Sequence, residues 1–87
     1  MRILKESFNP NQVAISQTQE GTKLVFNNMT TASGAKIQLS QLDRAISDIT
    51  PTDLNGTTGY QFVVQDTKDM YDAIALLGTY GYDIIQG

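Results

Sequence analysis

The residues best suited to chemistry in this chain are carboxylates, because the sequence contains no cysteine and no histidine. Asp66, Asp69 and Asp72 recur at every third position where a helix is predicted to begin. At about 100° and 1.5 Å per residue, this spacing spreads them over about 120° of the helix and about 9 Å along its axis, so three ligands would not converge on one metal ion. Acidic side chains in a first turn instead favour the helix dipole, and Asp66 is suited to cap the helix. We therefore expect neither a metal site nor a catalytic group here.

The segment 52–59 is the second place where chemistry is conceivable, because it combines two glycines with oxygen-bearing side chains. It resembles the start of a calcium-binding loop, but no glutamate follows to complete the pattern. Its backbone N–H groups could also meet an anion, although the lysine of a phosphate-binding loop is missing. A small-ligand site for an anion or a nucleotide is therefore the alternative function. Its residues would be Asp53, Asn55, Thr57, Thr58 and Asp66.

Composition excludes several classes of function. Without cysteine and histidine the chain has no thiolate nucleophile, no disulfide and no imidazole to activate a serine. The net charge is −3 and the six basic residues occur singly, which disfavours nucleic acid as a partner. No apolar run reaches the roughly 20 residues of a membrane helix, and the N-terminal residues lack the apolar core of a signal peptide. We expect a cytoplasmic protein, in its own cell or a host cell, that is not an enzyme and uses no cofactor.

The length and the 40% hydrophobic content predict one compact domain spanning residues 1–87. Two β-prone runs at 13–17 and 23–27 flank a segment containing Gly21, which predicts a hairpin. Further strands are expected at 2–8, 35–39, 60–65 and 82–86, and loops at 28–34 and 52–59.

Two helices complete this pattern. Ser40 is placed to cap a helix over 40–49, whose apolar stripe is Leu42, Ala45, Ile46 and Ile49. The other helix runs from about Asp66 to Tyr80 and ends at Gly81. The order β-β-β-β-α-β-α-β predicts an α+β fold. Its mixed, mainly antiparallel sheet would have five or six strands and two helices on one face.

The helix at 66–80 is apolar over more of its circumference than one sheet face covers. Tyr71, Ala75 and Gly78 extend its apolar arc beyond the residues that face the sheet. Packing of the helix at 40–49 against this flank is the simpler explanation, since neighbouring helices on a sheet commonly touch. A second copy of the chain, or another protein, is the alternative.

A second apolar feature lies on the sheet face that carries no helices. Val63 points away from Tyr60, Phe62 and Val64 on its strand. Single apolar residues occupy the same side of the other predicted strands: Ile3, Ala14, Val25 and Ile85. In register, they would form an apolar band that a partner could contact. Ordinary β-propensity is the simpler explanation for each of them alone.

These features favour a small protein–protein interaction module that binds another protein or a second copy of itself. A short chain without catalytic residue types also suits an accessory or inhibitor protein of the kind that phages and mobile elements encode. The predicted partner-binding residues are Tyr71, Ala75 and Gly78 on the helix, with Val25, Val63 and Ile85 on the sheet.

Overall fold

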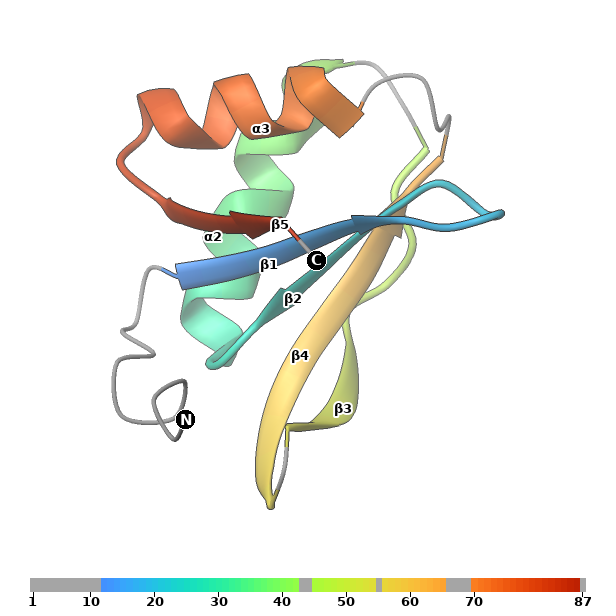
Figure 1. The fold of residues 1–87 in the computed structure, drawn as a ribbon, viewed down its shortest axis with the longest axis vertical. Coiled ribbons are helices and arrows are strands. Elements are labelled where there is room, and N and C mark those ends of the chain that lie inside the picture. Colours follow the sequence, from blue (N-terminus) through green and yellow to red (C-terminus); the bar gives the residue numbers. More distant parts are fainter. Residues whose placement is uncertain (1–11, 43–44, 55, 66–69, 87) are drawn as a thin grey trace.

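Five strands in the described part of the chain form one mixed sheet, in the order β3-β4-β2-β1-β5 (Figure 1). The computed structural model describes residues 12–42, 45–54, 56–65 and 70–86. All neighbouring strands are antiparallel except β1 and β5, which are parallel. The strands are β1 (Gln12–Gln17), β2 (Thr22–Phe26), β3 (Thr50–Leu54), β4 (Thr57–Val64) and β5 (Asp83–Gln86).

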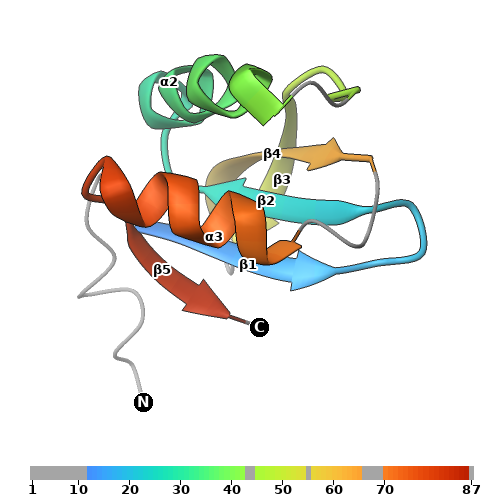
Figure 2. The same cartoon turned by 90° about the horizontal axis from the view of Figure 1, so that it is seen from above.

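Both helices lie on the same face of this sheet, as Figure 2 shows. Helix α2 (Met29–Leu39) contacts β2 and β4, and α3 (Met70–Thr79) contacts β1 and β5. A short 3₁₀ turn, η1 (Ser40–Leu42), extends α2. The predicted α+β class, the mixed sheet and the shared helix face are therefore confirmed. The strands joined by α3 are not neighbours, because β2 and β1 lie between β4 and β5.

The core fills the space between the helices and the face of the sheet that they cover. Alternation along the strands directs every second side chain toward the helices. Phe26 and Phe62 stack there with ring centroids 5.5 Å apart, and Tyr82 meets Phe26 edge-on. The buried hydrophobic side chains are Val13, Ile15, Leu24, Phe26, Ala32, Ala35, Leu39, Phe62, Val64, Ala73 and Leu77.

Helix α2 replaces the loop predicted at 28–34 and the strand predicted at 35–39, so both predictions are wrong. Asn28 caps the helix, its Oδ1 accepting a hydrogen bond from the Thr31 N–H at 2.7 Å. The buried side of α2 carries two alanines and Leu39, and small residues give only a weak apolar stripe. Ile37 points to solvent on the other side, with 69% of its surface exposed. In the sequence, Ile37 alternates with Ala35 and Leu39, which is the pattern of a half-buried strand.

The helix predicted at 40–49 is also wrong. Ser40 ends α2 instead of starting a helix, and its hydroxyl donates to the Ile37 carbonyl at 2.6 Å. Ile46 forms an antiparallel bridge with Val64, whereas Thr50 pairs with Gln61. Three residues on one side thus oppose two on the other, which is a one-residue β-bulge. The bulge lets Ile46 and Ile49 both pack on the core although three positions separate them, the spacing of a helix.

The loop predicted at 52–59 is a hairpin between β3 and β4. Leu54 pairs with Thr57, so the connection is only the two residues Asn55 and Gly56. Gly56 has a φ of 98°, a value that glycine adopts without strain. An Asn-Gly pair between β-prone residues is a strong hairpin signal, but the threonines of this segment do not alternate with apolar residues, so the pattern of a half-buried strand is missing.

The predicted hairpin of β1 and β2 and the predicted end of α3 are both confirmed. Gly81 has a φ of 87° and follows the helix as its C′ residue. Its N–H donates to the Gly78 carbonyl at 3.1 Å, and the Tyr82 N–H donates to the Leu77 carbonyl at 3.0 Å. This pair of bonds is a Schellman motif. The strand predicted at 2–8, with Ile3, and the helix start at 66–69 lie outside the described residues.

Candidate interaction site

Three of the five residues of the small-ligand site expected from the sequence lie within the described part of the chain. Asp53, Thr57 and Thr58 lie exposed in the β3–β4 hairpin, where an Asp53 oxygen accepts the Gly56 N–H at 3.2 Å. Helix α3 follows the opposite end of β4 (Figure 1). The eight residues of β4 span about 24 Å at the usual rise per residue. Asn55 and Asp66 are outside the described residues. In the described part of the chain, no group of three acidic residues could hold a metal ion.

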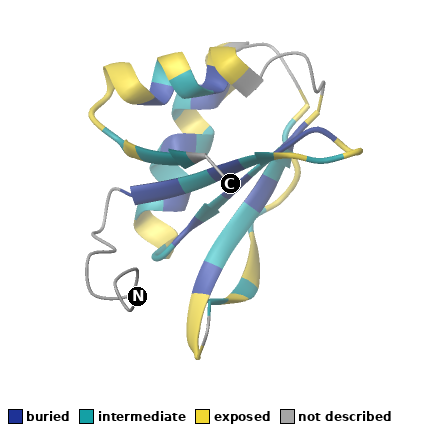
Figure 3. Ribbon diagram, in the orientation of Figure 1, coloured by how far each residue is buried: buried dark blue, intermediate teal, exposed yellow. Residues whose placement is uncertain are grey.

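The apolar arc of α3 faces solvent on the side that we call the outer flank: Tyr71, Ala75 and Gly78. All three are exposed, and Tyr71 has 68% of its surface accessible. Ala73 and Leu77, on the opposite side, are buried in the core. Figure 3 shows exposed and buried stretches alternating along the ribbon of α3. The described chain therefore covers one side of α3 and leaves the outer flank open.

Helix α2 does not pack on the outer flank, so the simpler explanation offered by the sequence is wrong. The Gln41 side chain donates to the Tyr80 hydroxyl at 3.2 Å, which places the α2–η1 segment on the other side of α3. Tyr80 lies about 170° around the helix from the middle of the outer flank, at about 100° per residue. The described chain therefore does not bury the outer flank. A function for this flank must be argued from the elements that lie beside it.

Tyr82 shows what the closed side of α3 looks like by comparison. Its hydroxyl lies only 3.5 Å from where a side-chain carbon on Gly34 would be, so the glycine gives it room beside α2. Burial in this position raises the pKa of the Tyr82 phenol, because the charged phenolate would lose its hydration. Here a tyrosine is part of the packing, whereas Tyr71 is not.

The strand beneath the outer flank, β5, forms one edge of the sheet. Among the described residues, its outer side pairs with no strand. Ile84 lies under α3, since its Cδ1 is 4.0 Å from the position of a Cβ on Gly78, and Ile85 faces the opposite side of the sheet. The other edge strand, β3, carries Pro51, which has no backbone N–H and opposes pairing with a further strand. Strand β5 has neither proline nor lysine.

The sheet face without helices carries part of the predicted apolar band. Ile85 pairs with Ala14, and Ala14 pairs with Val25, so these three residues form a continuous row across β5, β1 and β2. Gln61 interrupts the row on β4, because it is the partner of Val25. All three apolar residues are half-buried. The row therefore ends at the β5 edge, directly below the outer flank of α3.

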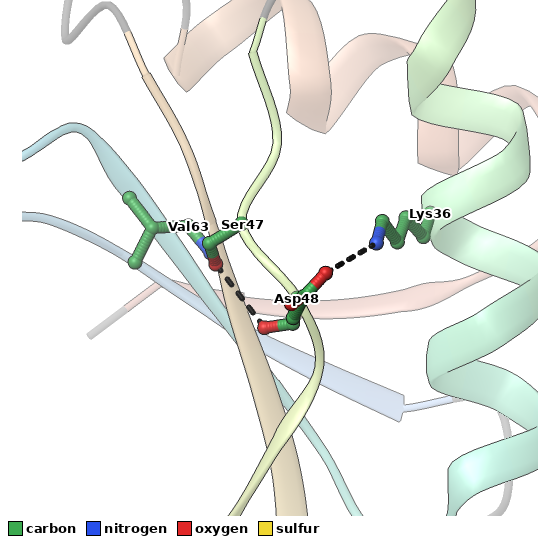
Figure 4. A network of polar contacts seen from close by, with 4 residues as sticks. All are labelled: Lys36, Ser47, Asp48 and Val63. Atoms are coloured by element: carbon green, nitrogen blue, oxygen red, sulfur yellow. Dashed lines mark hydrogen bonds and ion pairs between the residues drawn. The ribbon is translucent and has the colours of Figure 1, made fainter.

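Val63 stands apart from this row. It pairs with Lys23 on β2, one diagonal step away from Val25. Its backbone N–H donates to the Ser47 hydroxyl at 2.9 Å, beside the contact of 3.9 Å between Lys36 and Asp48 (Figure 4). At the bulge, the Ser47 hydroxyl thus accepts the hydrogen bond that a backbone carbonyl would accept in a regular strand pair. Val63 belongs to the β4 side of the sheet and not to the β5 edge.

The six predicted partner-binding residues therefore fall into two groups. The first group is near β5: Gly78 of the outer flank, which also holds Tyr71 and Ala75, lies next to Ile84, and Ile85 is joined to Val25 through Ala14. Val63, on β4, forms the second group. Sequence reasoning missed the edge itself, which depends on strand order. In the described ranges, no helix is long and apolar enough to cross a bilayer. Comparison of the chain with family models, with curated proteins and with solved structures found no match.

Proposed function

We propose that this protein is a small, non-enzymatic protein–protein interaction module. Its docking surface is the β5 edge, made of the outer side of Asp83–Gln86 together with Tyr71, Ala75 and Gly78 above it. The observation that carries the proposal is the coincidence of two open features. An edge strand without proline or lysine lies below an exposed apolar helix flank, with Ile84 of β5 next to Gly78 of that flank.

Strand addition gives this surface a physical means of binding. A partner strand placed against β5 would satisfy backbone N–H and C=O groups of the edge and would extend the sheet. Its neighbouring side chains would meet the tyrosine on the helix side and Ile85 on the other side. Aromatic residues such as Tyr71 bury a large area with few rotatable bonds, and they are enriched at binding hot spots.

The test compares Tyr71→Asp with Ile37→Asp. Ile37 is a matched control because it is equally exposed, at 69% against 68%, but lies on α2 away from the β5 edge. Both variants should melt close to the unaltered protein, since exposed positions contribute little to stability. Immobilised protein is then used to capture binding proteins from extracts of cells that express it. Proteins retained by the unaltered chain and by the Ile37 variant should be lost with the Tyr71 variant, and equal capture by all three would refute the assignment.

A further inference from the structure

The β5 edge is self-complementary, and this observation narrows the choice of partner. Resting on the proposed function, we propose that the surface binds a second copy of this chain. The two β5 strands pair antiparallel about a two-fold axis perpendicular to the sheet. The result is one continuous sheet of ten strands, twice the five described strands of each copy. All four helices lie on the same face of it.

The spacing of strands and helices fits this arrangement. Neighbouring strands lie about 4.8 Å apart, and α3 contacts both β1 and β5, so a helix above their midpoint lies about 2.4 Å inside the edge. Pairing of β5 with its symmetry mate then separates the two α3 axes by about 10 Å. Packed helices have interaxial distances of about 8–10 Å, and small side chains bring the axes closer. Ala75 and Gly78 supply those small side chains.

The distribution of sizes along α3 also fits a two-fold axis. An axis passing near Ala75 makes the helices antiparallel and places Tyr71 of each copy opposite Gly78 of the other. A large side chain thus meets the residue with no side chain, twice, by symmetry. From Ala75 to Tyr80 the helix rises about 7.5 Å. The same length along β5 from Tyr82, at about 3.3 Å per residue, reaches Ile84 and Ile85. The same two-fold axis therefore passes near Ala75 in the helix layer and near Ile84 and Ile85 in the sheet layer.

Continuity of the sheet joins the apolar rows of the two copies. Residues that face each other across an antiparallel pair lie on the same side of the sheet. The row Val25–Ala14–Ile85 of one copy therefore runs toward the corresponding row of the other. The outer flank carries no charged side chain, and Asp83 is engaged by the Gln12 amide at 3.2 Å. Like-charge repulsion does not oppose the contact at its centre.

The estimated area of the contact indicates how strongly the two copies would bind. The flank is about 15 Å long, from ten residues at 1.5 Å each. A strand and a helix together are about 20 Å high, which gives on the order of 300 Å² per copy in projection. Contacts of this size belong to the weak and transient class. We therefore expect a dissociation constant in the micromolar range or above, about 1 μM to 1 mM.

Sedimentation velocity on the purified full chain, over that same range of concentrations, tests the dimer. Tyr71→Asp and Gly78→Lys should each weaken association at least tenfold, while Ile37→Asp should associate as the unaltered chain does. Gly78→Lys is tolerated by the monomer because only Ile84 lies near the new carbon, at 4.0 Å. Thermal melting of each variant confirms folding, and if the Gly78 variant does not fold, the Tyr71 and Ile37 pair still decides.

Mixing the two weakened variants tests the register. A heterodimer of Tyr71→Asp with Gly78→Lys has one native Tyr71–Gly78 contact and one new Asp–Lys contact, so association should return to within tenfold of the unaltered chain. A chain that stays monomeric throughout, or a mixture as weak as its components, overturns the dimer. In the monomeric case, capture of other proteins that depends on Tyr71 would leave the proposed function standing.

Discussion

Replacing Gly21 with alanine should destabilise the protein more than any other glycine-to-alanine change at a turn. Gly21 closes the β1–β2 hairpin with a φ of 146°, a region that side chains avoid. An added Cβ would overlap the Val64 carbonyl oxygen and approach Gln65 Cα to 2.9 Å. These are backbone atoms of the β4 end, which cannot move aside as a flexible side chain could.

Two costs add in this substitution. The disfavoured φ contributes about 1–3 kcal/mol, and forced overpacking contributes about 1–3 kcal/mol. The sum of about 2–6 kcal/mol is a large part of the 4–13 kcal/mol expected at about 0.05–0.15 kcal/mol per residue. Gly81→Ala is the matched control: its φ is 87°, but no atom lies within 4 Å of the added carbon. It should lose only about 1–2 kcal/mol, the cost of a left-handed backbone.

Urea denaturation followed by circular dichroism measures both variants. With a slope of about 1.5 kcal/mol per molar, the midpoint should fall by about 1 M for Gly81→Ala and by roughly 1.5–4 M for Gly21→Ala. The Gly21 variant is expected to be partly unfolded without urea if its loss reaches the upper end. Midpoints that agree within error for the two variants would refute the steric argument, because the backbone cost alone would then explain both.

Two further substitutions test other parts of the structure. Gly78→Ala should stabilise the monomer by about 0.5–1 kcal/mol, because alanine favours the helix and its methyl group meets only Ile84 at 4.0 Å; an unchanged or lower melting temperature would contradict the open outer flank. Tyr82→Phe should remove part of the alkaline loss of stability. Burial raises the pKa of Tyr82 in the folded state, so above about pH 10 the unfolded chain binds fewer protons and stability falls as pH rises. Urea midpoints at pH 8 and pH 11 should differ less for the variant, and identical losses would contradict the partial burial of the Tyr82 phenol.

The sequence was sufficient wherever one local signal agreed with the packing around it. The β1–β2 hairpin followed from two β-prone runs around Gly21, and the Schellman end of α3 followed from Gly81. In α3 the apolar side chains recur with helical spacing, which was enough to predict the helix, although Tyr71 of the same apolar arc is exposed. Such segments need no knowledge of their neighbours.

The middle of the chain misled because its local patterns had two interpretations. Ile37 alternates with Ala35 and Leu39 as in a strand, yet it is the solvent-facing residue of a helix whose buried side is alanine-rich. Ile46 and Ile49 have helical spacing, yet a bulge in an extended segment brings both to the core. In each case the local conformation depended on packing against residues that are distant in the sequence.

By itself the sequence determined the fold class, the final helix and strand, and the lack of thiol and imidazole chemistry, because composition and local periodicity fix these without long-range contacts. Strand order was decided only by the tertiary structure. Placing β2 and β1 between β4 and β5 makes β5 an edge strand that α3 contacts, while Pro51 lies at the other edge. Hydrogen bonding between strands is non-local, so no pattern within β5 could show that its outer side pairs with no described strand.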